Sequence, residues 1–154
     1  MNTFAQDEPI SAFLEKWESS KKYLLEMAEA MPEDKYPFKP TAREMSFGEQ
    51  LLHIKGNMSW LSSSYFGAPK IEESEKTLTK AEIIALLDVS FTNVSNAIKA
   101  TKPEDLKLKV DFFAGEKTKL QILNLLQDHV THHRGQLIVY LNLNEIKPPK
   151  YVGW

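Results

Sequence analysis

Three helix-start signals, spread along the chain, constrain the fold of this sequence more than any other feature. In each signal a Ser or Thr is followed three residues later by Glu or Gln, directly before a run with helical apolar spacing. The two side chains satisfy each other's free backbone N–H groups, so this capping box predicts where a helix begins. The three pairs are Ser46 with Glu49, Thr79 with Glu82, and Thr118 with Gln121. We predict helices that begin at these three points, the first ending near Gly67 and the last near Asn142.

A fourth helical segment precedes these three. Asp7 or Glu8 with Pro9 predicts its start, and Pro32 predicts its end. The stretch from Pro32 to Met45 is rich in proline and mixed charge, and we expect an ordered loop there. The apolar residues of the segment, which recur mostly at steps of three, four or seven as in a helix, are Ile10, Phe13, Leu14, Trp17, Leu24, Ala28 and Met31.

Four long amphipathic segments with one longer connection favour an all-α four-helix bundle. The length of 154 residues fits one domain, 1–154. Between Lys102 and Lys117 apolar residues instead alternate with charged ones, and Ala114-Gly115-Glu116 has the composition of a turn. This pattern predicts a short strand or hairpin before the last helix. We expect Trp17 and Trp60 to lie in the core.

Composition excludes several classes of function. The chain has no cysteine, so disulfides, thiolate ligands and a cysteine nucleophile are absent, and any thiol chemistry needs a substrate thiol. The first residues are polar and acidic, and no apolar run approaches the roughly 20 residues of a membrane span. Net charge is −2 with both signs interspersed, unlike a nucleic-acid binder. We expect a cytoplasmic protein that binds neither membranes nor nucleic acid.

The histidines are concentrated in the last predicted helix. His129 and His133 are four residues apart, so they point the same way, and they continue the apolar stripe of that helix. Two imidazoles buried on adjacent turns need several hydrogen-bond partners, and a metal ion supplies one partner to both. His53, in the second helix, is a candidate third ligand because bundles build metal sites from facing helices. A pair formed by His129 and His132 is a geometrical alternative.

Two familiar helical metal motifs do not match this spacing. A zincin needs Glu directly after the first histidine of its pair, where this chain has Val130, and a di-iron bundle needs repeated Glu-x-x-His. A mononuclear site with neutral nitrogen ligands remains, and its open coordination positions are typical of catalytic metals. Imidazole ligation suits Zn²⁺, Ni²⁺, Cu²⁺ or Fe²⁺ and does not choose between them. The expected cofactor is one divalent metal ion, which we expect to be Zn²⁺ or Ni²⁺, with Fe, Mn or Cu as alternatives.

Four further side chains are candidates for the layer around the ligands: Asp128, His132, Arg134 and Gln136. Asp128 could orient an imidazole through its second ring N–H, as metal-bound histidines usually require. The alternative for Asp128 and Arg134 is an ordinary ion pair exposed to solvent. His132 lies about 60° from His129 around an ideal helix, which favours a supporting role.

These motifs together resemble the DinB/YfiT-like superfamily over nearly the whole chain. The resemblance rests on Asp-His-Val-Thr-His-His-Arg-Gly-Gln at 128–136, the histidine at 53, Lys39-Pro40 before the second helix, and Tyr140-Leu141 followed by Pro148-Pro149. It implies an up-down-down-up four-helix bundle, often dimeric, with a divalent metal held by three histidines. In this chain those ligands fall on His53, His129 and His133.

Characterised members of that superfamily include metal-dependent transferases of low-molecular-weight thiols such as bacillithiol, mycothiol or glutathione, and a thiol-dependent maleylpyruvate isomerase. The resemblance therefore implies a low-molecular-weight-thiol S-transferase or related detoxification enzyme, with a small-molecule substrate and a homodimeric assembly. Two alternatives stay open. One is a hydrolase that uses metal-activated water, and the other is a non-enzymatic, stress-associated protein that binds metal or a partner.

Overall fold

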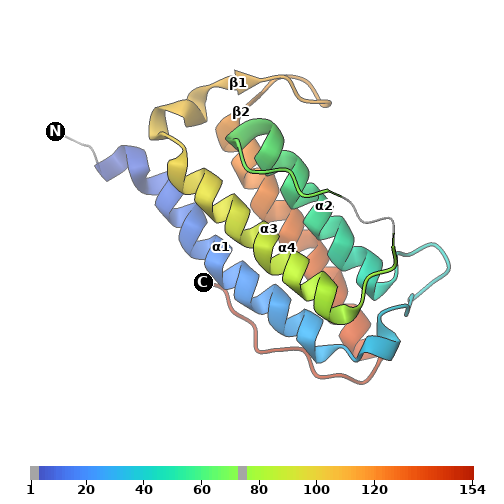
Figure 1. The fold of residues 1–154 in the computed structure, drawn as a ribbon. Coiled ribbons are helices and arrows are strands. Elements are labelled where there is room, and N and C mark those ends of the chain that lie inside the picture. Colours follow the sequence, from blue (N-terminus) through green and yellow to red (C-terminus); the bar gives the residue numbers. More distant parts are fainter. Residues whose placement is uncertain (1–3, 73–75) are drawn as a thin grey trace.

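The computed structural model describes residues 4–72 and 76–154, and its long helices form a bundle (Figure 1). A short hairpin precedes the last helix as expected. Its two antiparallel strands of two residues each are β1 (Lys109–Val110) and β2 (Lys117–Thr118). No helix within the described ranges is long and apolar enough to cross a membrane. The four long helices are α1 (Phe4–Ala30), α2 (Phe47–Phe66), α3 (Lys80–Ala100) and α4 (Lys119–Leu143).

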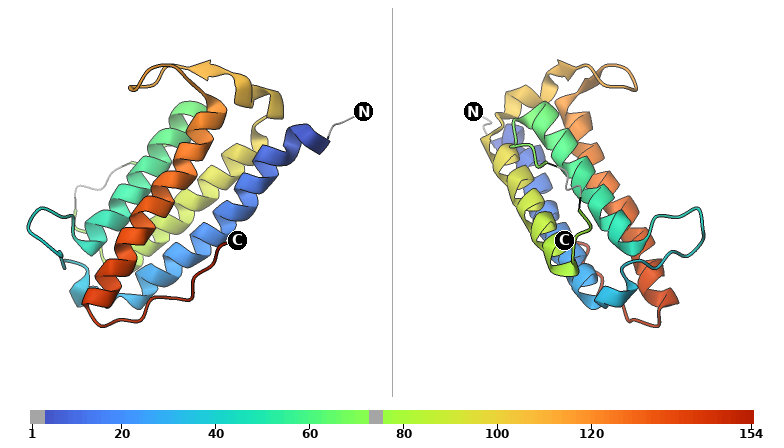
Figure 2. Two further views of the ribbon diagram at one scale, coloured as in Figure 1. Left: turned by 180° about the vertical axis from the view of Figure 1, so that it is seen from behind. Right: turned by 45° about the vertical axis from the view of Figure 1, so that its right-hand side comes forward.

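The helices have the up-down-down-up arrangement. α1 and α4 run in one direction, and α2 and α3 run in the other (Figure 1, Figure 2). Each of α1 and α2 packs against both α3 and α4. Because α2 and α3 are parallel, α3 begins at the end of the bundle opposite to the one where α2 ends. α2 and α4 are therefore antiparallel neighbours, and their seam holds the candidate site.

All three predicted capping boxes are present in the structure. Ser46, Thr79 and Thr118 are the N-cap residues of α2, α3 and α4, and each side chain accepts a hydrogen bond from the backbone N–H three residues on. α2 ends at Gly67, whose φ of 73° lies in the left-handed region that glycine adopts without strain. The helix starts predicted from the sequence are thus confirmed.

The start of α1 differs from the prediction. The helix begins at Phe4 rather than near Pro9, which lies inside it. Proline lacks the N–H that would bond the carbonyl four residues earlier, but near the end of a helix this removes only one bond. The predicted end is accurate, because the helix stops at Ala30, two residues before Pro32.

The two tryptophans expected in the core have different surroundings. Trp17 is fully buried, and its Nε1 donates a hydrogen bond to the carbonyl of Phe91 at 3.2 Å. Trp60 is 42% exposed and stacks on Phe112 of the hairpin loop, with ring centroids 5.9 Å apart. Trp60 lies seven residues beyond His53 on nearly the same face of α2, and this face is turned away from the core. The prediction was correct for Trp17 and wrong for Trp60.

Candidate metal centre

The seam between α2 and α4 brings three histidines together. His53 comes from the middle of α2, and His129 and His133 come from successive turns of α4. One ring nitrogen from each of the three lies within 4.8 Å of the others. The ring centroids are 4.9 Å apart for His53 and His129, 4.6 Å for His53 and His133, and 4.4 Å for His129 and His133. These three residues could hold one metal ion between them.

Exposure is graded across this histidine cluster. His133 is buried, with 7% of its surface exposed, His129 is half-buried, and His53 is exposed. The apolar stripe of α4 predicted inward histidines, and the structure places them at the edge of the core. The cluster is therefore anchored on the α4 side and open to solvent on the His53 side, as a site that admits a small molecule requires.

Burial keeps two of the imidazoles neutral. It lowers the pKa of His129 to about 4, and the charges that His133 and His53 would carry when protonated lower it further. Burial likewise lowers the pKa of His133 to about 4, with repulsion from His53 as the next cause. A neutral imidazole offers the lone pair that a metal requires, so His129 and His133 are in the binding form at pH 7.

The ring nitrogens are spaced as metal ligands would be. Nε2 of His129 and Nε2 of His53 are 3.1 Å apart. Two nitrogens at ~2.0–2.1 Å from a tetrahedral Zn²⁺ would lie about 3.3 Å apart. This pair fits the distance closely, and the donor set of neutral nitrogens suits Zn²⁺, Ni²⁺, Cu²⁺ or Fe²⁺.

Gln50 fixes the orientation of the buried histidine. Its Oε1 lies 2.6 Å from Nδ1 of His133. An amide oxygen only accepts hydrogen bonds, so Nδ1 of His133 carries the hydrogen and donates it. The lone pair of His133 is then on Nε2, the nitrogen left for a metal. Metal-binding histidines are commonly oriented in this way through their second ring nitrogen.

The hydrogen-bond chain continues from Gln50 to the surface. Nε2 of Gln50 donates to Oε1 of Gln136 at 2.6 Å, and Nε2 of Gln136 lies 2.9 Å from Nε2 of His132. Gln50 Nε2 also lies 3.4 Å from the hydroxyl of Tyr140, which donates to the carbonyl of Met45 at 2.6 Å. Both glutamine amides thus have their oxygen toward one partner and their nitrogen toward the next. Gln136 and His132 thus support the cluster through Gln50.

Two of the residues proposed for the surrounding layer lie elsewhere. Asp128 is exposed, and Nδ1 of His129 is buried with no hydrogen-bond partner among the described residues, so Asp128 does not orient this imidazole. Arg134 is buried on the opposite side of α4, where its Nη1 donates to Oγ of Ser20 at 3.5 Å. The alternative of an ion pair between Asp128 and Arg134 is not present either.

Sequence reasoning did not assign Gln50 a role at the site. Gln50 stands three positions before His53, where a di-iron site would need Glu. The useful signal was its place one turn before His53, as an amide among apolar neighbours. A buried amide needs partners, and the nearest polar groups across the seam are the histidines of α4.

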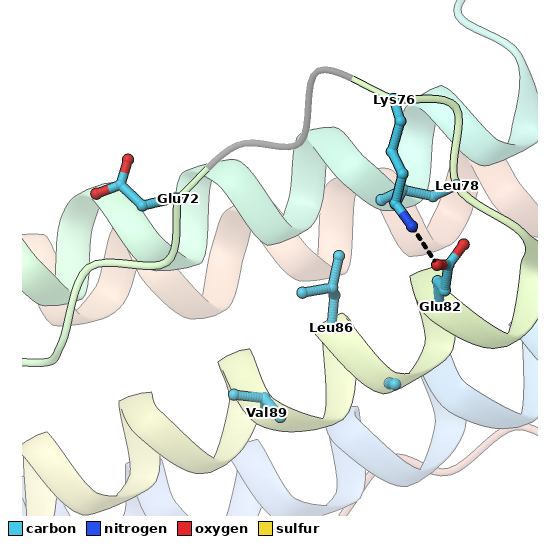
Figure 3. A pocket seen from close by; sticks show the side chains of 7 residues that line it. Glu72, Lys76, Leu78, Glu82, Leu86 and Val89 are labelled. Carbon is cyan, nitrogen blue, oxygen red and sulfur yellow. Dashed lines mark hydrogen bonds and ion pairs between the residues drawn. The ribbon is translucent and has the colours of Figure 1, made fainter.

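A pocket of about 460 Å³, with no histidine among its lining residues, lies between Glu72, Lys76 and Leu78 on one side and α3 on the other (Figure 3). Its apolar wall includes Leu78, Leu86 and Val89. Across it, Nζ of Lys76 forms a 2.7 Å ion pair with Glu82, the capping-box residue of α3. The pKa of Glu82 is lowered to about 2, first by the hydrogen bond from Lys76 and then by those from Thr79. The carboxylate therefore serves the helix start, and the pocket adds nothing to the metal centre.

Fold and cluster together define a helical-bundle protein with a three-histidine group suited to a metal ion. The family model described as DinB family matches residues 1–151, and the chain belongs to this family. It is 30% identical over 129 residues to an uncharacterized protein, YjoA, of Bacillus subtilis strain 168, covering 75% of this chain and 78% of that protein.

Two solved structures share the fold. The crystal structure of the DinB-like YjoA from Bacillus subtilis has a TM-score of 0.76 at 20% identity and covers 91% of this chain and 96% of its own. That of a DinB-like protein from Bacillus cereus ATCC 10987 has a TM-score of 0.79 at 20% identity and covers 92% and 97%. The up-down-down-up bundle expected from the sequence is thereby confirmed.

Proposed function

We propose that this DinB-family chain is a divalent-metal-dependent enzyme that transfers a low-molecular-weight thiol to an electrophile. The observation that carries the proposal is the cluster of His53, His129 and His133, whose ligand nitrogens lie within 4.8 Å of one another. Three protein ligands leave a coordination position open, as catalytic sites do. The exposed His53 marks the side from which a substrate enters.

The chain's own residues prepare the site for this chemistry. A bound divalent ion such as Zn²⁺ would lower the pKa of a thiol beside it enough to favour the thiolate at neutral pH. Gln50 holds His133 so that Nε2 faces the cluster, and burial keeps the imidazoles of His129 and His133 uncharged, each with one nitrogen lone pair available. In the reaction a sulfur–carbon bond forms, the bond from carbon to the leaving group breaks, and the thiol proton and leaving group pass to solvent.

Because the chain has no cysteine, the reacting thiol comes from the substrate. We further propose that the enzyme acts in the cytoplasm as a homodimer, on a small-molecule substrate. Sedimentation velocity at micromolar concentration tests the assembly, and a monomer under these conditions would reject the dimer.

The metal site is tested first, by mass spectrometry of metal content. We expect the wild-type protein to bind one divalent ion, and the variants His53→Ala, His129→Ala and His133→Ala to lose it. Asp128→Ala is the matched control, because Asp128 lies beside His129 on the same helix but is exposed and outside the cluster, and it should keep the metal. Full occupancy after loss of His53 would contradict the three-ligand assignment.

The activity is tested separately on metal-loaded protein with a panel of low-molecular-weight thiols and a haloarene as electrophile. We expect consumption of thiol and release of halide faster than with metal-stripped protein. Equal rates would reject thiol transfer. Turnover of an ester or amide substrate without any thiol would instead support the hydrolase alternative.

A further inference from the structure

Two buried polar atoms near the histidine cluster have no hydrogen-bond partner among the described residues. They are Oδ1 of Asn57 and Nδ1 of His129. Buried polar atoms in folded proteins are nearly always paired, so each of these two atoms needs an explanation. One is the acceptor of an amide, and the other is a ring nitrogen that can carry a hydrogen.

The register of α2 against α4 places these two residues opposite each other. Gln50 bonds to Gln136, and one turn further along α2 His53 lies against His133. Both pairs have the same offset between the antiparallel helices. One further turn advances α2 by four residues to Asn57, while α4 goes back by four residues to His129. Asn57 and His129 are thus the next facing pair along the seam.

The chemistry of the two atoms is complementary when His129 binds a metal. Nε2 of His129 faces His53 at 3.1 Å and is the nitrogen available to an ion. The hydrogen of a neutral imidazole must then be on Nδ1, which becomes a donor. The amide oxygen of Asn57 is an acceptor with no other partner in the part of the chain that the structure describes. Metal-bound histidines usually donate through their second nitrogen to such a group.

We propose that Asn57 is a positioning residue whose Oδ1 accepts the Nδ1 hydrogen of His129 when the site holds its metal ion. The proposal rests on the metal site of the proposed function, though not on thiol transfer. It gives the cluster a symmetrical support, in which two amides of α2 flank His53 on either side along the helix. Gln50 orients His133, and Asn57 orients His129.

The test measures affinity for Zn²⁺ by competition with a chromogenic chelator. Loss of an orienting residue typically weakens metal binding about 10–100-fold, and we expect this for Asn57→Leu. Asn57→Asp keeps an acceptor oxygen at the same place and should retain the wild-type affinity. The matched control is Gln127→Leu, since Oε1 of Gln127 is also buried without a partner but its Nε2 bonds Ser20 on the α1 side.

A second readout separates positioning from folding. In the Zn²⁺-loaded wild type, heteronuclear NMR of the histidine rings should show a slowly exchanging hydrogen on Nδ1 of His129, and this hydrogen should exchange faster in Asn57→Leu. Circular dichroism checks that both variants are folded. Unchanged Zn²⁺ affinity in folded Asn57→Leu, or a drop of equal size in Gln127→Leu, would overturn the proposal.

The result is distinguishable from failure of the proposed function. If the wild type binds Zn²⁺ and Asn57→Leu weakens it, the role of Asn57 holds even if no thiol is transferred. If the wild type binds no Zn²⁺, both the metal site and the role of Asn57 are overturned.

Discussion

α4 buries polar side chains both where it packs against α2 and where it packs against α1. The buried groups are uncharged at the α2 seam and positively charged at the α1 seam. Toward α2, α4 presents His129 and His133, which are neutral at pH 7, and His133 is hydrogen-bonded to the amide of Gln50. Toward α1 it presents Arg134, a permanent cation that is only 5% exposed. Adjacent positions on a helix lie about 100° apart, so neighbours in sequence serve different seams. The arrangement keeps a fixed positive charge away from a site that would bind a cation.

The α1 seam stabilises Arg134 without a carboxylate partner. Its guanidinium lies 5.1 Å from the ring centroid of Tyr23 and bonds Oγ of Ser20, and none of the ion pairs within residues 4–72 and 76–154 includes it. Burial and the charge of Arg134 lower the pKa of nearby Lys16. Lys16 in turn donates to the carbonyl of Gly153 in the C-terminal tail, which runs back along α1 (Figure 2). This seam holds the C-terminal tail against α1 through Lys16 and Gly153.

Truncation of Arg134 should have the largest effect among the changes that distinguish the α1 seam from the α2 seam. Arg134→Ala leaves a cavity and removes the stacking on Tyr23, and it should lower the free energy of unfolding by about 2–4 kcal/mol. Urea denaturation followed by circular dichroism measures this, and Arg134→Met, which keeps most of the volume, should cost less. Zn²⁺ affinity should stay unchanged in both variants. A loss of affinity as large as that of His133→Ala would show that the seams are not independent.

A substitution of Gln50 tests the α2 seam, where we expect the main effect on Zn²⁺ affinity. Gln50→Leu removes the acceptor of His133 Nδ1 and should weaken Zn²⁺ binding about 10–100-fold, or ~1.4–2.7 kcal/mol. Gln50→Glu keeps an acceptor toward His133 and should retain most of the affinity. Chelator competition measures both variants beside the wild type. If Gln50→Leu binds Zn²⁺ as tightly as Gln50→Glu, the orientation of His133 does not depend on this amide.

The helix starts were predictable because the signal is local. A capping box needs only two side chains three residues apart, so Ser46, Thr79 and Thr118 could be read from the sequence alone. For α1, Asp7 or Glu8 with Pro9 predicts a start that the structure places within the helix. Trp60 was misplaced because α2 is apolar on more than one face, so periodicity does not say which face meets the core.

The candidate site was only partly predictable, because it depends on the offset between two helices. Spacing places His129 and His133 on one stripe, and resemblance to a family added His53. The partners Gln50 and Asn57 follow from the register of α2 against α4, which depends on how these two helices pack. Asp128 and Arg134 were proposed for the site by proximity in sequence, and helix geometry turns both away from it.

The pH dependence of stability should also distinguish the seams, with an intermediate effect. The pKa values of His129 and His133 are about 4 in the fold against 6.5 ordinarily, so the unfolded chain binds more protons between these values. The free energy of unfolding of the metal-free protein should therefore fall as pH drops from 6.5 to 4, by roughly 1–2 kcal/mol given the open His53 side. Urea titrations at each pH measure it. Arg134→Met should keep this dependence of unfolding free energy on pH, and the double variant His129→Ala, His133→Ala should lose it. The same pH dependence in the wild type and both variants would assign the effect to other groups.

The smallest expected effect concerns how α2 is held at its start. Ser46→Ala removes the side chain that accepts from the N–H of Glu49 and should lower the free energy of unfolding by about 1 kcal/mol. Thr79→Ala removes the matching cap of α3, which contributes no histidine, and should cost a similar amount. Gln50 lies in the turn that Ser46 caps, so only Ser46→Ala should also weaken Zn²⁺ binding, by less than Gln50→Leu does. Equal Zn²⁺ affinity in the two cap variants would mean that the α2 seam is positioned by its packing on α4 and not by the start of the helix.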